Sequence, residues 1–251
     1  MALRDDFGNY WDGNGLLAPN PGVWSPGQKG SDNSPMFTSE YYIMLKKNGQ
    51  LVDQDKADYQ QKIGQCVNAQ GMLNRVPVGQ NDGQEEVDDY YGTLNGCMQM
   101  QNTIIPRQYL ASLIKNWGFM DNVNPGSHSN WASFMPRQLQ MIACMVAASF
   151  PSWKNPLHIL IRLLCFPLFF YAALSIVVAG WGSPTSDTDA RRLSWHVWQC
   201  LKGQSLLCFL ASKIWLSRLY KQYGPTGMKA VAAIYYQPQP TNPYSTWWIT
   251  E

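Results

Sequence analysis

Four carboxylates lie within five positions of one short segment, "GQEEVDDYYG", residues 83–92. Neighbouring carboxylates repel one another, which raises the pKa of at least one of them and can produce a general acid at neutral pH. Acids also stabilise helix N-termini, and this accounts for Glu85 and Glu86 at a predicted helix start. Asp88 and Asp89 lie further into the predicted helix, where the helix dipole explains them less well. They are therefore the candidates for catalysis.

A second polar cluster, "SDNSPMFTSEYY", occupies residues 31–42. Ser34 is a good N-cap and Pro35 suits a first helical position, so a helix is predicted to begin here. Asp32 is either a turn residue before this cap or a further catalytic acid. Both clusters precede a predicted helix, and each contains a Tyr-Tyr pair. In a barrel of helical hairpins, loops of this kind meet at one mouth.

The elements that must position these residues are predicted to be helices. Local start and stop signals place helices at 34–47, 53–70, 84–100, from 106 and from 136. No segment shows convincing period-2 alternation, so the fold class is all-α with about nine helices. The chain divides into an extended, aromatic-rich arm at 1–33, an all-helical domain at 34–236 and an extended tail at 237–251.

Residues 157–179 form the most apolar run, with His158 and Arg162 as its only ionisable groups. A run of this length is sufficient to cross a bilayer. A central helix of a layered all-α domain is equally apolar. The adjacent helices carry basic residues at amphipathic spacing, which favours the buried helix, and membrane insertion is the alternative. His158 and His196 lie in apolar helices and are expected to be core or interface residues.

The overall composition limits the classes of partner and cofactor that the sequence suggests. The net charge is +2, which gives no indication of nucleic-acid binding. Six scattered cysteines read as structural thiols, and no metal or cofactor motif occurs. The N-terminal residues contain no apolar signal segment, so the expected location is cytoplasmic.

The two clusters and the terminal "NPYSTWW" resemble the (α/α)-toroid glycosidases and polysaccharide lyases, particularly helical proteins of bacteriophage type. The resemblance implies antiparallel helical hairpins in a toroid, incomplete here because too few helices are predicted. It also implies that inner-helix acids act as general acid and base, a role that falls to Asp88 and Asp89 with Asp32 as partner. Residues predicted to bind the glycan are Tyr41, Arg75, Tyr90, Tyr91, Trp117, His128 and Trp131.

A glycosidase needs two carboxylates roughly 5 to 9 Å apart. Asp88 and Asp89 point about 100° apart on a helix, so the second acid must come from another segment, such as Asp32 or Asp121. A lyase would instead use His128 or Tyr91 as base.

The leading hypothesis is therefore a glycan-binding or glycan-cleaving protein without cofactor or metal. One alternative is a membrane-associated protein that uses residues 157–179. Another is a non-catalytic, virion-associated assembly protein that grips a neighbour through its arm and tail. The oligomeric state is left open.

Overall fold

The computed structural model describes residues 3–13, 15–17, 34–74, 77–78, 87–115, 119–120, 131–132, 136–182, 188–211, 213–214 and 247. It describes the backbone alone at 87–89, 119–120, 131–132, 136–138, 176–182 and 188–194. The predicted all-α class is confirmed. The elements are α1 Leu3–Asp6, η1 Gly8–Tyr10, α2 Ser34–Lys47, α3 Asp53–Gly64, α4 Val87–Gln99, α5 Ile104–Lys115, β1 Phe119–Met120, β2 Trp131–Ala132, α6 Pro136–Ser149, α7 Pro156–Leu164, α8 Phe166–Gly182 and α9 Thr188–Leu201.

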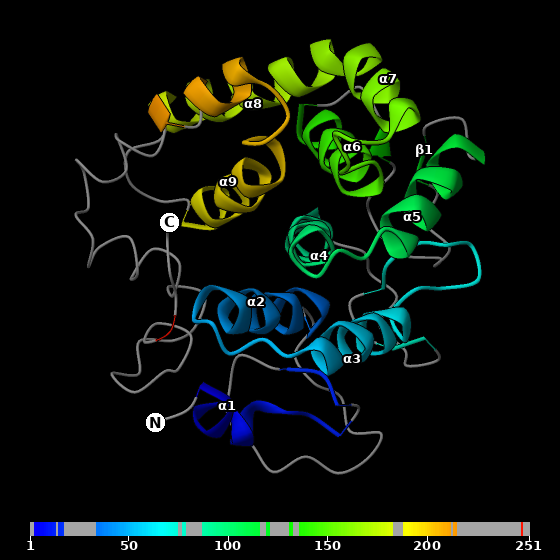
Figure 1. The fold of residues 1–251 in the computed structure, drawn as a ribbon, viewed down its shortest axis with the longest axis vertical. Coiled ribbons are helices and arrows are strands. Elements are labelled where there is room, and N and C mark those ends of the chain that lie inside the picture. Colours follow the sequence, from blue (N-terminus) through cyan, green and yellow to red (C-terminus); the bar gives the residue numbers. More distant parts are fainter. Residues whose placement is uncertain are drawn as a thin grey trace.

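Helix α4 lies at the centre of the described fold. It is seen end-on in Figure 1, between α2, α5, α6 and α9, and it contacts all four helices. Every residue from Tyr90 to Cys97 is buried, so α4 has no solvent-facing side over these two turns. Its sequence therefore lacks the one-sided apolar stripe of a surface helix.

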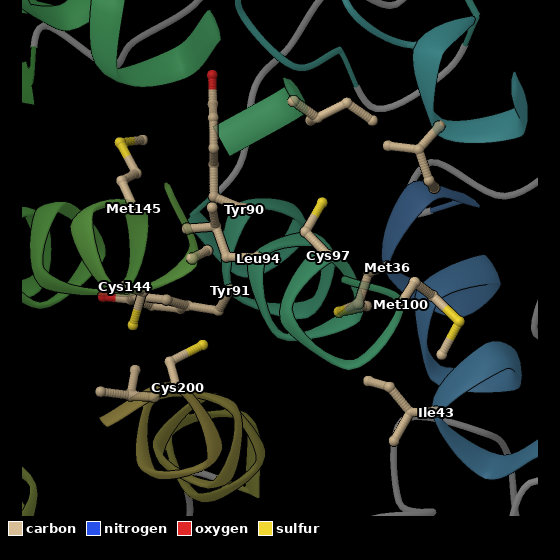
Figure 2. Packing of buried hydrophobic residues seen from close by; sticks show 14 of the residues in the cluster. Met36, Ile43, Tyr90, Tyr91, Leu94, Cys97, Met100, Cys144, Met145 and Cys200 are labelled. Carbon is tan, nitrogen blue, oxygen red and sulfur yellow. The ribbon is translucent and has the colours of Figure 1, made fainter. Parts of the chain in front are cut away.

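Two glycines let α2 approach α4 closely. Gly92 lies against Met36, and Gly96 lies against Ser39 and the Tyr59 hydroxyl. The residues in contact advance together along both helices, which shows that α2 and α4 run in the same direction. Their N-termini therefore lie at the same end of the pair. Figure 2 shows the core on either side of α4, with α2 on one side and the thiols of α6 and α9 on the other.

Local signals predicted several boundaries correctly. Helix α2 ends before Asn48, where Gly49 adopts φ 68°, and α6 begins at Pro136 as predicted. Helix α5 begins at Ile104 rather than at residue 106, because the Asn102 side chain accepts hydrogen bonds from the backbone N–H groups of the first two helical residues. The prediction missed this N-cap.

Two predicted features of the middle of the chain need correction. Helix α3 ends at Gly64, not near residue 70, because the chain turns back and Val67 forms a β-bridge with Leu73. The long segment after α5 contains two short strands, β1 and β2, which pair in antiparallel orientation. This pairing was not predicted from the sequence. Two paired residues a strand give too short an alternation to be recognised.

The described part of the N-terminal segment packs against the helices. Leu3 and Phe7 are fully buried, and the Arg4 guanidinium donates to both carboxylate oxygens of Asp55, at 3.1 and 2.7 Å. Residues 3–10 form short helices rather than an extended chain. Near the other terminus, the Trp247 indole donates to Asp6. Residues 3–13 and 15–17 of the arm, which one of the alternatives assigned to gripping a neighbouring subunit, thus pack on their own chain.

The apolar run at 157–179 is divided between two helices. Helix α7 ends at Leu164 and α8 begins at Phe166, with a bend of 57° between them. A proline at the second position of α8 suits a helix start and explains the break. The prediction of one buried central helix is wrong for α7, whose leucines are exposed.

Candidate functional site

Most of the predicted catalytic and binding residues lie outside the described side chains. Asp32, Arg75, Trp117, Asp121 and His128 are outside the described residues. Asp88 and Asp89 are described through their backbone, which lies in the first turn of α4, and Trp131 through its backbone in β2. Their roles stay predictions. A carboxylate in a first helical turn is also explained by the helix dipole.

The three predicted binding tyrosines that the structure describes lie in the core. Tyr41, Tyr90 and Tyr91 are at most 3% exposed, and Figure 2 shows Tyr90 and Tyr91 leaving α4 in different directions. The Tyr90 hydroxyl accepts a hydrogen bond from the Leu73 N–H, and the Tyr91 hydroxyl donates to Gln140. A sugar stacks on an open ring face. In this conformation these rings are packing residues.

A buried polar network joins three of the helices around α4. His196 on α9 contacts the Glu40 carboxylate through Nε2 and the Asn95 amide through Nδ1, each at 3.0 Å. The side chains of Glu40 and His196 are fully buried. The expectation that His196 is a core residue is confirmed. A fully buried network is closed to substrates. Its role in this conformation is structural, because it links α2, α4 and α9.

Helix α7 has an inverted distribution of polarity. Leu157, Leu160, Leu163 and Leu164 are 54–72% exposed, whereas Arg162 is only 4% exposed. A surface helix of a globular protein normally places leucines inward and arginine in water. The outward leucines follow a spacing of three to four residues, so they form one stripe along the helix.

This stripe continues onto neighbouring segments. We call the whole surface the apolar face, formed by Trp153, α7, the first half of α8 and the described residues 206–211 and 213–214. These segments lie at the end of the molecule farthest from α1 (Figure 1). Its exposed residues are Trp153, Leu157, Leu160, Leu163, Leu164, Phe170, Tyr171, Leu174, Leu206, Leu207, Phe209, Leu210 and Ile214. Exposed apolar side chains gathered at one end of a folded protein mark an interaction site.

Arg162 anchors α7 from the inside. Its guanidinium donates to the carbonyl oxygens of Pro151 and Gly203 and to the Gln204 side chain. It also lies 4.0 Å from the centre of the Trp153 ring. No carboxylate among the described residues forms an ion pair with it. Burial lowers the Arg162 pKa to about 10, so the group keeps its charge at neutral pH.

Three lysines lie in or next to the segments of the apolar face. Lys154 precedes α7, Lys202 follows α9 and Lys213 lies next to Ile214 at the end of the described part of the face. Burial, and then repulsion from Lys213 and Lys46, lowers the pKa of Lys202. The described residues of 139–175 and 195–214 include no Asp or Glu.

The sequence analysis missed this asymmetry because it used only the total charge. Residues 1–121 contain fourteen acids and nine basic residues, a net charge of −5. Residues 122–251 contain three acids and ten basic residues, a net charge of +7. The near-neutral total hides two oppositely charged halves. A comparison of the halves would have revealed the signal.

Among the described residues no group of side chains could hold a metal ion. Among the same residues no single helix has the length and apolar character to cross a membrane. The bent pair 156–164 and 166–175 has that length and composition only when its two helices are taken together. No family model, curated protein or solved structure matches the chain.

Proposed function

We propose that the protein associates with the surface of a lipid bilayer through the apolar face. The observation that carries the proposal is the inverted polarity of α7, with four leucines in solvent and Arg162 inside. Helices that lie in a membrane interface present leucine and aromatic side chains on one side and basic residues nearby. Trp153, half exposed at the margin of the face, is the residue type enriched at such interfaces.

The dimensions favour a helix that lies on the membrane. Helix α7 has nine residues, which gives a length of about 13 Å. The hydrocarbon core is about 30 Å thick. With its leucines along one side and its opposite side anchored through Arg162, α7 suits insertion parallel to the membrane surface.

Vesicle flotation tests the proposal. The full chain is mixed with vesicles of phosphatidylcholine and phosphatidylserine, and the floating fraction is measured as lipid is titrated. Complete burial of a leucine is worth about 1.5–3 kcal/mol, so Leu160 and Leu163, each more than half exposed, contribute about 1 kcal/mol apiece. The double variant Leu160→Ser/Leu163→Ser should therefore bind roughly 30-fold more weakly.

Val52 provides the matched control. It is 55% exposed, like Leu160, but it precedes α3, away from the apolar face. Val52→Ser should leave binding unchanged. Wild-type protein that stays with the soluble fraction at every lipid concentration would refute membrane association, and so would equal losses in the face and control variants.

A glycan-processing site at the N-termini of α2 and α4 is the second candidate function. One geometric feature favours it, because the two helices run in the same direction and the predicted acids immediately precede or begin them. On this proposal Asp32 and either Asp88 or Asp89 act as the acid pair. The incomplete toroid of helical hairpins would then form the glycan cleft.

Hydrolysis and lyase assays on a polysaccharide panel test this second function. Activity that falls at least 100-fold in Asp88→Asn or Asp89→Asn would support it, since acid–base catalysis contributes about 10²–10⁴-fold. Asp53→Asn removes an exposed acid at the start of α3 and serves as the control. Activity that is equal in all variants would remove the assignment.

A further inference from the structure

We propose that the apolar face selects bilayers that contain anionic phospholipids and that α1–α3 point away from the bilayer. This inference rests on the membrane association proposed above. It adds the chemistry of the lipid headgroup and the orientation of the bound molecule.

The first support is that no described carboxylate pairs with the lysines of the face. The ion pairs between described side chains involve Arg4, Lys56, Lys62 and His196, and none involves a lysine of the face. The Lys202 and Lys213 ammonium groups instead lie 4.8 and 5.5 Å from the centres of aromatic rings, those of Trp198 and Phe209. Their charge is therefore not neutralised by a neighbouring carboxylate in the described structure.

The second support is the distribution of charge along the molecule. The described residues of 139–175 and 195–214 carry four basic residues and no acid. At the opposite end (Figure 1), the described residues of 3–74 carry seven acids and five basic residues. An anionic surface attracts the first end and repels the second. The charge distribution thus orients the molecule with the apolar face toward the lipid.

The headgroup chemistry follows from these cations. A lysine beside an apolar side chain can keep its ammonium group at headgroup level while its stem lies along the apolar surface. Phosphatidylserine supplies net negative charge there and phosphatidylcholine does not. Each lysine close to an anionic surface strengthens binding by about fivefold. Lys154 and Lys213 are both exposed, so together they should contribute roughly 25-fold.

The test compares two vesicle compositions, phosphatidylcholine alone and phosphatidylcholine mixed with phosphatidylserine. Wild-type protein should bind the mixed vesicles far more tightly, and added salt should reduce the difference. Lys154→Gln/Lys213→Gln should lose roughly 25-fold on mixed vesicles and little on phosphatidylcholine. The control is Lys56→Glu, which changes net charge equally but lies on α3, in an exposed pair with Asp53. It should bind like wild type.

The outcomes separate the two proposals. Equal binding to both compositions would overturn the anionic preference and leave membrane association standing. Binding to neither would overturn both. Equal losses in the face and control variants would show a response to net charge alone and would overturn the orientation. A dimer that dissociates in Leu160→Ser/Leu163→Ser would assign the face to a second copy of the chain and would also overturn the inference.

Discussion

Replacement of Gly96 by alanine should destabilise the protein, although alanine is the better helix former. Alanine is favoured over glycine in a helix by about 1 kcal/mol. A Cβ at residue 96 would lie 2.4 Å from the Tyr59 hydroxyl oxygen and 2.7 Å from the Ser39 Cβ. Both distances are far below van der Waals contact. Helices α2 and α4 must therefore separate, and the 3.1 Å hydrogen bond between Ser39 and Tyr59, both of which the Cβ displaces, must break.

The expected size of the effect follows from these two responses. Overpacking of a core costs about 1–3 kcal/mol, and the loss of one hydrogen bond costs about 1 kcal/mol. After the gain in helix propensity, a net destabilisation of about 2 kcal/mol remains. For a chain of this length 1 kcal/mol corresponds to about 2–4 °C, so the Tm should fall by roughly 4–8 °C.

Gly64 is the matched control. It is the last residue of α3, and a Cβ there would meet no atom within 4 Å. Gly64→Ala should raise the Tm by up to about 4 °C. Thermal unfolding followed by circular dichroism measures both variants. Tyr59→Phe removes the clashing hydroxyl, so Gly96→Ala should cost less in that background. A Tm for Gly96→Ala at or above the wild-type value would refute the close contact between α2 and α4.

Three further predictions concern buried groups. Glu40→Ala should lower the free energy of unfolding in urea by roughly 1–3 kcal/mol, because the buried His196 Nε2 loses its hydrogen bond to the carboxylate; Glu40→Gln keeps an oxygen acceptor and should cost less. Burial raises the pKa values of Tyr41 and Cys97 to about 12, from 10.0 and 9.0, so their stabilisation is complete below pH 9 and is lost as the pH rises toward 12. Urea midpoints should fall across that range, and a flat profile would contradict the burial. Of the six free cysteines only Cys165 is partly exposed, so a thiol reagent should rapidly modify at most one cysteine in the folded protein and six in denaturant.

The sequence predicted the features that depend on adjacent residues. The Asn48-Gly49 stop and the start at Pro136 are local, and both are found where they were predicted. The Val67–Leu73 bridge depends on contacts made only after the chain has folded back. The α3 boundary was therefore misplaced, although its start at Asp53 was correct.

The apolar face shows a different limit. Hydropathy averaged over 157–179 describes how apolar the segment is and contains no information on which side faces solvent. The spacing of the α7 leucines predicts a stripe, but the same stripe suits a core or a surface. Likewise, His196 was recognised as a core residue, while its contact with Glu40 spans 156 positions and requires the folded arrangement. The acids predicted for catalysis lie outside the described side chains and stay predictions.

Arg162 gives a physical reason for the outward leucines. Burial of apolar area alone would rotate α7 until the leucines faced the core. That rotation would break three hydrogen bonds of a charged side chain and its contact with Trp153. Hydrogen bonds to charged groups are worth about 1.5–3 kcal/mol each, comparable to the burial of a leucine. The arginine thus fixes the rotation of the helix, and the exposed stripe is available for a partner that is itself apolar.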